Sequence, residues 1–149
     1  MKKIILLFLA ATTSCFAADI TQSQLDESKS ERREKAFEDW IPVGESQIRF
    51  DELNEDGEFP IYSERKGGKV RDIFIDKPDG LYYWTWASMP KEELLKKHKQ
   101  YTQEGLILVA LSEHDNGYFW ATWVNESNER KVLRQLKRFG ITQASIEID

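Results

Sequence analysis

Two aromatic segments that resemble each other constrain this chain most strongly. Residues 81–89 contain Tyr82-Tyr83-Trp84-Thr85-Trp86, residues 118–124 contain Tyr118-Phe119-Trp120-Ala121-Thr122-Trp123, and together they hold four of the five tryptophans. Aromatic and β-branched side chains fit the pleated surface of a sheet, so both segments are predicted to be strands. Each is followed by a helical pattern that ends at a glycine, Gly105 or Gly140, which is the residue expected just past a helix end.

The C-terminal half of the chain reads as an ordered series of elements. After the strand at 81–89 come a helix from Pro90 to Gly105, a strand at 106–113, a tight turn at Asn116-Gly117, the strand at 118–124, a helix at 125–139 and a last strand at 143–148. Asn-Gly favours a type I′ hairpin turn with positive φ at both residues. The order predicts an α+β fold with a ferredoxin-like split β-α-β-β-α-β sheet and two helices on one face.

The segment before this half indicates an N-terminal β-meander. Residues 48–53 alternate apolar and polar and predict a short strand, and residues 59–62 and 70–76 predict two more around the turn glycines Gly67 and Gly68. Residues 77–80, Lys-Pro-Asp-Gly, form a second predicted turn, so that residues 61–88 read as a three-stranded meander. Asp51, Asn54 and Asp56 do not make a calcium loop, because Tyr62 stands where the closing Glu is needed.

The N-terminus has the order of a secretory signal. Met1-Lys2-Lys3 is basic, an apolar run follows, and Ala17 offers a small residue at the cleavage edge, so residues 1–17 are predicted to be a signal peptide and the protein to be periplasmic or secreted. The alternatives are a lipoprotein with lipid on Cys15, or an N-terminal anchor or buried helix. Residues 18–39 are predicted to be a flexible polar tether, helical from about Ser30, and residues 40–149 a single α+β domain.

Charge and cysteine content narrow the classes of partner. The chain has 149 residues with 21 basic and 26 acidic side chains, and removal of Lys2 and Lys3 leaves 19 basic residues and a net charge of −7. An acidic chain is a poor match for nucleic acid or for an anionic membrane surface. Because Cys15 is the one cysteine, cleavage after Ala17 removes the means to form a disulfide or a cysteine metal site.

No residue pattern predicts catalysis, a metal site or a cofactor. His98 has Thr102 rather than a second ligand four residues on, and it reads as a packing residue at the edge of a helix stripe. His114 lies in the turn region between two strands. Ser112 is near it in sequence, but the two side chains would point the same way, without the framework of a nucleophilic site. The protein is therefore predicted not to be an enzyme.

The aromatic strands are the remaining candidate for function. Tyr82, Trp84 and Trp86 share one face of their strand, and the helices are expected to cover the other, with Leu81, Tyr83 and Ala87. The open face is then continued by Tyr118 and Trp120, or by Phe119 and Trp123, depending on register. The predicted ligand-binding set is Tyr82, Trp84, Trp86, Tyr118 and Trp120. The alternative is that residues 40–76 cover this face and the rings fill a core.

The run Tyr82-Tyr83-Trp84-Thr85-Trp86-Ala87-Ser88-Met89, with the Asn-Gly hairpin, Tyr118-Phe119-Trp120 and the two glycine-terminated helices, resembles the SPOR domain over residues 81–149. Ser88 falls where that family often has serine. The resemblance implies a split βαβ fold in a bacterial envelope protein that binds peptidoglycan glycan strands lacking stem peptides on the open sheet face.

These observations predict an exported, non-catalytic binding module of the bacterial cell envelope, with glycan as the ligand. The alternative is a periplasmic inhibitor or immunity-type protein that binds another envelope protein, because an acidic domain of this size can steer a basic partner. Neither hypothesis involves nucleic acid or stable membrane insertion after removal of the signal.

Overall fold

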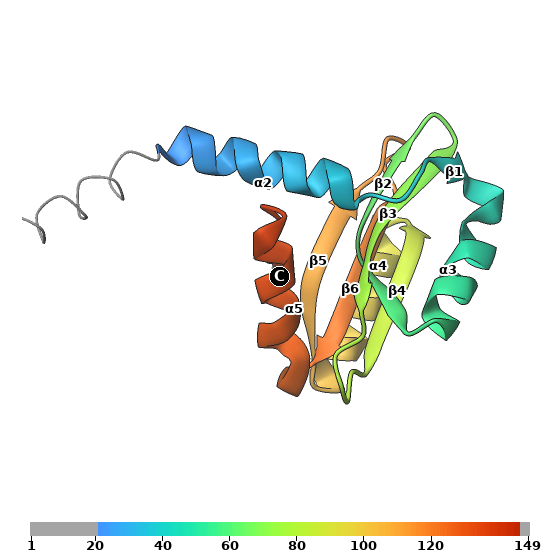
Figure 1. The fold of residues 1–149 in the computed structure, drawn as a ribbon. Helices are drawn as coiled ribbons and strands as arrows, with labels where there is room; N and C mark the ends of the chain where they lie inside the picture. Colours follow the sequence, from blue (N-terminus) through green and yellow to red (C-terminus); the bar gives the residue numbers. More distant parts are fainter. Residues whose placement is uncertain (1–20, 147–149) are drawn as a thin grey trace, which may run out of the picture.

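Two antiparallel sheets of three strands each form the centre of the structure, a computed structural model that describes residues 21–146 (Figure 1). Sheet A has the order β1-β3-β2, from β1 (Ile41–Pro42), β2 (Glu58–Lys66) and β3 (Lys69–Asp76). Sheet B has the order β4-β6-β5, from β4 (Tyr83–Met89), β5 (Leu106–Glu113) and β6 (Phe119–Asn125). The predicted α+β class is confirmed, and the signal peptide predicted at 1–17 lies outside the described residues.

The helices lie around these two sheets. They are α2 (Gln22–Ala36), α3 (Ser46–Glu55), α4 (Lys91–Gln103) and α5 (Glu126–Arg138), and a short 3-10 turn, η1 (Val43–Glu45), precedes α3. The helices α4 and α5 fall where the sequence predicted them, and the glycines that follow them, Gly105 and Gly140, have φ of 83° and 68°. Positive φ is the conformation that ends a helix and is easiest for glycine.

One buried cluster holds sheet A against one face of sheet B. Phe59 and Ile61 of β2 and Ile73 of β3 pack with Trp120 and Val124 of β6, and all five are at most 2% exposed. The turn between β2 and β3 has Gly67 and Gly68 at positive φ, as predicted for a tight hairpin. Sheet A therefore covers a large part of this face of sheet B.

The predicted meander of residues 61–88 is incorrect in its third strand. β3 pairs with β2 and with β1, and β4 pairs instead with β6 in sheet B. The turn at 77–80 carries the chain from one sheet to the other. Turn chemistry at Pro78 and Gly80 predicts a reversal of the chain, but it does not say which strand the emerging segment will pair with.

The predicted ferredoxin-like arrangement of both helices on one face is also incorrect. Val132 and Leu136 of α5 join the buried cluster beside sheet A, whereas Leu94 and Tyr101 of α4 pack with Trp123 on the other face of sheet B. The alternation of β6 explains the difference. Both of its faces are apolar and buried, so each needs its own cover.

The last strand, predicted at 143–148, is absent from the described part, residues 143–146. This segment follows β5 without forming a ladder: the Ala144 N–H donates to the Val109 carbonyl over 3.4 Å, and the Gln143 side chain donates to the Leu108 carbonyl over 3.4 Å. A ferredoxin-like fold would place the last strand beside β4. Because α5 packs mainly on β5, the chain emerges at the opposite edge of sheet B, and β4 remains an edge strand.

The strand predicted at 48–53 is a helix in the structure, α3. Ile48 is 62% exposed. The half-buried positions of α3 recur at the spacing of a helix face, and they are Ser46, Arg49, Phe50, Leu53 and Asn54. The apolar alternation that suggested a strand depended on Ile48, which is not part of the core.

The predicted polar tether, 18–39, contains a longer helix than expected. Helix α2 begins at a capping box, in which Thr21 and Gln24 bond each other's backbone N–H groups, and no residue of α2 is buried. Its contacts with the body are few. Arg71 of β3 bonds Glu34, and Phe37, just past the helix, bridges to Ile73. In Figure 1 the first turns of α2, drawn in blue, project beyond the sheets.

Candidate binding surface

Three rings, one just before β4 and two within it, form an exposed row along the free edge of sheet B. Tyr82, Trp84 and Trp86 are 53%, 40% and 37% exposed, and we call these three residues the aromatic ridge. Their partners on the strand point the other way: Tyr83 packs against Phe59 of sheet A, and Thr85 bonds Thr122. The predicted separation of β4 into two faces is therefore present, with the ridge on the more exposed one.

The rings of the ridge contact one another in sequence. Tyr82 and Trp84 meet edge to face at 6.5 Å, and Trp84 and Trp86 lie nearly parallel, with centroids 6.5 Å apart and 20° between the planes. The Trp84 indole N–H donates to the Tyr82 hydroxyl over 3.1 Å. These contacts limit the rotation of the rings, so the surface that they offer is largely formed in advance.

Helix α4 supports the ridge from one side. The Tyr101 ring stacks on Trp84 at 5.8 Å with 5° between the planes, and its hydroxyl accepts a hydrogen bond from the Trp86 indole N–H over 2.7 Å. The Lys97 ammonium lies 3.4 Å from the centre of the Trp86 ring, a cation–π contact. Burial raises the pKa of the Tyr101 hydroxyl above its ordinary value.

The buried Trp123 and the half-buried His98 form a pair beneath α4 that fixes the helix on the sheet. The Trp123 indole N–H donates to Nδ1 of His98 over 3.1 Å, and the Tyr101 ring meets Trp123 edge to face at 5.1 Å. A ring nitrogen that accepts a hydrogen bond carries no proton, and burial lowers the pKa of His98, which favours this neutral form. His98 has the packing role that its place on the helix predicted.

The structure does not bring all the predicted binding residues together. Trp120 is 2% exposed and lies on the opposite face of sheet B, in the cluster with sheet A, so its assignment to the binding face is incorrect. Tyr118 is 41% exposed but lies in the connection before β6, and within residues 21–146 it shares no ring contact with the ridge. The alternative pair, Phe119 and Trp123, lies on the α4 face but is packed in its core.

Sequence reasoning missed two residues of this surface, Lys97 and Tyr101. Both lie in the helix predicted from Pro90 to Gly105, but the sequence pattern did not connect that helix to β4. The available signal was their spacing of four residues, which puts both on one side of α4. The sequence did not show that this side faces the ridge.

The described residues show neither a metal-binding cluster nor a membrane-spanning helix. Within 21–146 no group of three or more His, Cys, Asp or Glu side chains is arranged to hold a metal ion. Among the helices in that range, none has the length and apolar character needed to cross a membrane. Comparison of the chain with family models, with curated proteins and with solved structures finds no match in any of the three.

Proposed function

We propose that the protein is an exported, non-catalytic binding module of the bacterial cell envelope that binds glycan through the aromatic ridge. The single observation that supports this most is the row of three contacting rings along β4 and the residue before it, held by hydrogen bonds from the indole groups of Trp84 and Trp86. Sugar rings present flat C–H faces that pack on such surfaces, and ordered rings bind with little loss of conformational freedom.

The resemblance to the SPOR domain supports the same ligand class. The described strands β4, β6 and β5 lie in the order of the first three strands of a split βαβ sheet. Here, however, α4 occupies the face that carries the ridge, which restricts the proposed contact to the part of that face next to the edge of β4. The export proposal depends on residues 1–17 and on the cleavage expected after Ala17.

The proposal is tested by co-sedimentation of the purified protein with protein-free cell-wall sacculi. The wild type should sediment with the sacculi, and Trp84→Ala should reduce the bound fraction at least about tenfold. The substitution removes the central ring of the ridge, and Trp86 and Tyr101 lose the ring on which they stack. Circular dichroism checks that the variant is folded. An exposed Trp84 costs less to remove than a buried one, so the fold should survive.

Tyr118→Ala is the matched control. Tyr118 is 41% exposed, close to the 40% of Trp84, but it is outside the ridge, so its removal should leave sedimentation within about twofold of the wild type. The glycan proposal is wrong if the wild type stays in the supernatant, or if the two variants bind equally well.

One observation favours a second candidate, an inhibitor or immunity-type protein. β4 is an edge strand of sheet B, and an uncharged edge strand with exposed rings can pair with a strand of another protein. This candidate predicts that Trp84→Ala weakens a complex with an envelope protein and that purified sacculi do not bind. The co-sedimentation result therefore separates the two candidates.

A further inference from the structure

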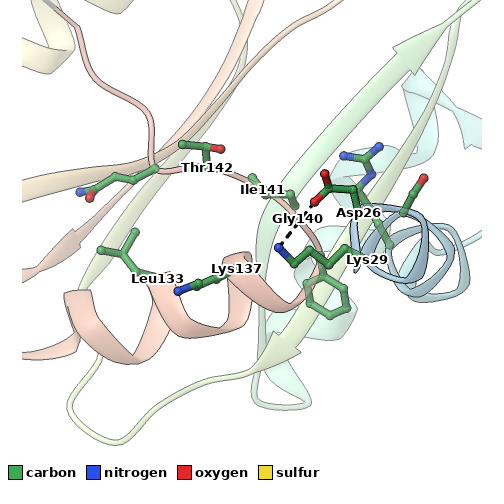
Figure 2. A pocket seen from close by; sticks show the side chains of 11 residues that line it. Asp26, Lys29, Leu133, Lys137, Gly140, Ile141 and Thr142 are labelled. Atoms are coloured by element: carbon green, nitrogen blue, oxygen red, sulfur yellow. Dashed lines mark ion pairs between the residues drawn. The ribbon is translucent and has the colours of Figure 1, made fainter. Parts of the chain in front are cut away.

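A cavity of about 570 Å³ lies between α2 and the chain that leaves α5, well separated in the fold from the aromatic ridge. Helix α2 provides Asp26, Lys29, Ser30 and Arg33, and the C-terminal end of α5 with residues 139–143 provides the rest. Figure 2 shows Lys137 and Lys29 on two sides of the open centre, with Thr142 on another. The volume is in the range of small-molecule sites.

The charges that line this cavity are mostly positive, although the whole chain has a net charge of −5. Lys29, Arg33 and Lys137 line it together with one carboxylate, Asp26. The Lys29 ammonium lies 3.9 Å from that carboxylate, a loose ion pair, and within residues 21–146 neither Arg33 nor Lys137 has an ion-pair partner. The cavity is thus a positive site on an acidic protein.

Arg33 shows an unmet need for a hydrogen-bond acceptor. Its Nε is shielded from solvent and has no partner among the described residues. A buried N–H without an acceptor costs free energy, which a ligand oxygen can recover, and guanidinium groups suit the planar or tetrahedral oxygens of carboxylates and phosphates.

Part of the lining of this cavity is apolar. Leu133, Phe139 and Ile141 line it, and all three also contact the buried cluster beside sheet A or belong to it. A cavity lined both by cations and by aliphatic and aromatic carbon is complementary to a molecule that carries an anionic head and an apolar body.

We propose that this cavity binds a small organic anion, with its carboxylate or phosphate head at Lys29, Arg33 and Lys137 and its apolar part against Leu133 and Ile141. This site is independent of the glycan proposal. It lies beside α5 and sheet A, whereas the aromatic ridge lies on the α4 face of sheet B.

The test is a titration of the ¹⁵N-labelled protein with octanoate, octyl phosphate and octanol, followed by NMR. Octanoate or octyl phosphate should shift the amide signals of Gly140 and Thr142 saturably, and the tighter of the two identifies the preferred head. Octanol has the same chain without the charge and should bind about tenfold more weakly, because it cannot pair with the cations.

Charge removal within the cavity provides the second arm. Arg33→Gln with Lys137→Gln should raise the dissociation constant of the better anion about tenfold, and Arg138→Gln should leave it within about twofold. Arg138 is the matched control because it follows Lys137 on α5 but lines a different cavity, beside Glu58 and Phe74.

Three results overturn the proposal: no saturable shift with either anion, octanol binding as tightly as the anions, or a double variant that binds like the wild type. If the double variant does not fold, the exposed Lys137→Gln alone decides, with about threefold weakening expected and unchanged binding counting against the site. Trp84→Ala should not affect any of these dissociation constants. Failure of the anion proposal therefore leaves the glycan proposal standing, and failure of the glycan proposal leaves the anion proposal standing.

Discussion

Asp72, in the middle of β3, has a carboxyl group with a strongly perturbed pKa. Burial raises its pKa from 3.8 to about 6, the neighbouring Glu38 carboxylate adds to the rise, and the Ser63 hydroxyl opposes it. The folded protein therefore holds a proton on Asp72 at pH values where the unfolded chain has lost it. Above about pH 6 the charged group opposes folding, and its cost falls away as the pH drops toward about 4.

Asp72→Asn tests this residue by keeping its size and removing its charge. Because a shift of about two pKa units corresponds to roughly 3 kcal/mol, the variant should be more stable than the wild type by about 2 kcal/mol near pH 8, and the gap should close near pH 4. Urea unfolding at several pH values measures this difference in the free energy of unfolding. Asp76→Asn, an exposed position on the same strand, should show no such trend, and a gap independent of pH would rule out the buried charge as its cause.

Also at the residue scale, the binding face could be predicted in part. Strand alternation alone placed Tyr82, Trp84 and Trp86 together, because it depends only on β4 being a strand. Trp120 was assigned wrongly because its face depends on how β6 is paired. The register sets Trp84 opposite Trp123 and Thr85 opposite Thr122, so the face with Trp84 continues through Trp123 and not through Trp120.

The hairpin between β5 and β6 shows how local geometry determines such a register. The expected type I′ turn needs positive φ at both Asn116 and Gly117, but among non-glycine residues in the described range only Ser88 has it. The Gly117 N–H donates to the His114 carbonyl over 3.0 Å, and the His114 N–H to the Tyr118 carbonyl over 2.8 Å. The loop is therefore longer by a residue than a two-residue turn, with glycine alone in the left-handed conformation.

Gly117→Val should destabilise the protein by about 1 kcal/mol or more, since a β-branched residue resists a φ of 75°. A Cβ at this position meets no atom within 4 Å, so the loss is conformational and not steric. Asn116→Val should cost less, because it removes only the bond that the Asn116 side chain accepts from the Tyr118 N–H. Thermal unfolding of the two variants compares their losses of stability. Equal losses would indicate that the turn is of type I′ after all.

At the element scale, the positions of the strands and helices were largely predictable and their packing was not. Turn glycines and helix periodicity mark where β3, β5, α4 and α5 begin and end, since these signals are local. For β2 only the start was predicted, because the strand expected at 59–62 continues to Lys66. Which face of sheet B each helix covers depends on distant segments. Both faces of β6 are apolar, and only the placement of sheet A beside α5 leaves the other face to α4.

At the scale of the whole molecule, sheet B separates two surfaces of different chemistry. The aromatic ridge and α4 lie on one face, while sheet A, α5 and the positive cavity lie on the other. Of these two surfaces, helix α2 contributes only to the cavity. Its links to the body are peripheral: the Lys29 side chain packs at Gly140, and Glu34 pairs with Arg71, which retains Glu64 as a second partner.

A chain that begins at Lys35 should therefore fold, with an unfolding free energy within about 1 kcal/mol of the longer protein. Helix α2 has no buried residue, and its ion pair to Arg71 comes from an exposed carboxylate, that of Glu34, so the pair contributes little. It keeps Phe37 and its bridge to Ile73. Sedimentation with sacculi should be unchanged, since the ridge is intact, whereas octanoate and octyl phosphate should lose their site with Lys29 and Arg33. Urea unfolding, sedimentation and the NMR titration on this one chain test the separation. Loss of sacculus binding would show that α2 takes part in binding at the ridge. Retained anion binding would show that the anion binds somewhere other than this cavity.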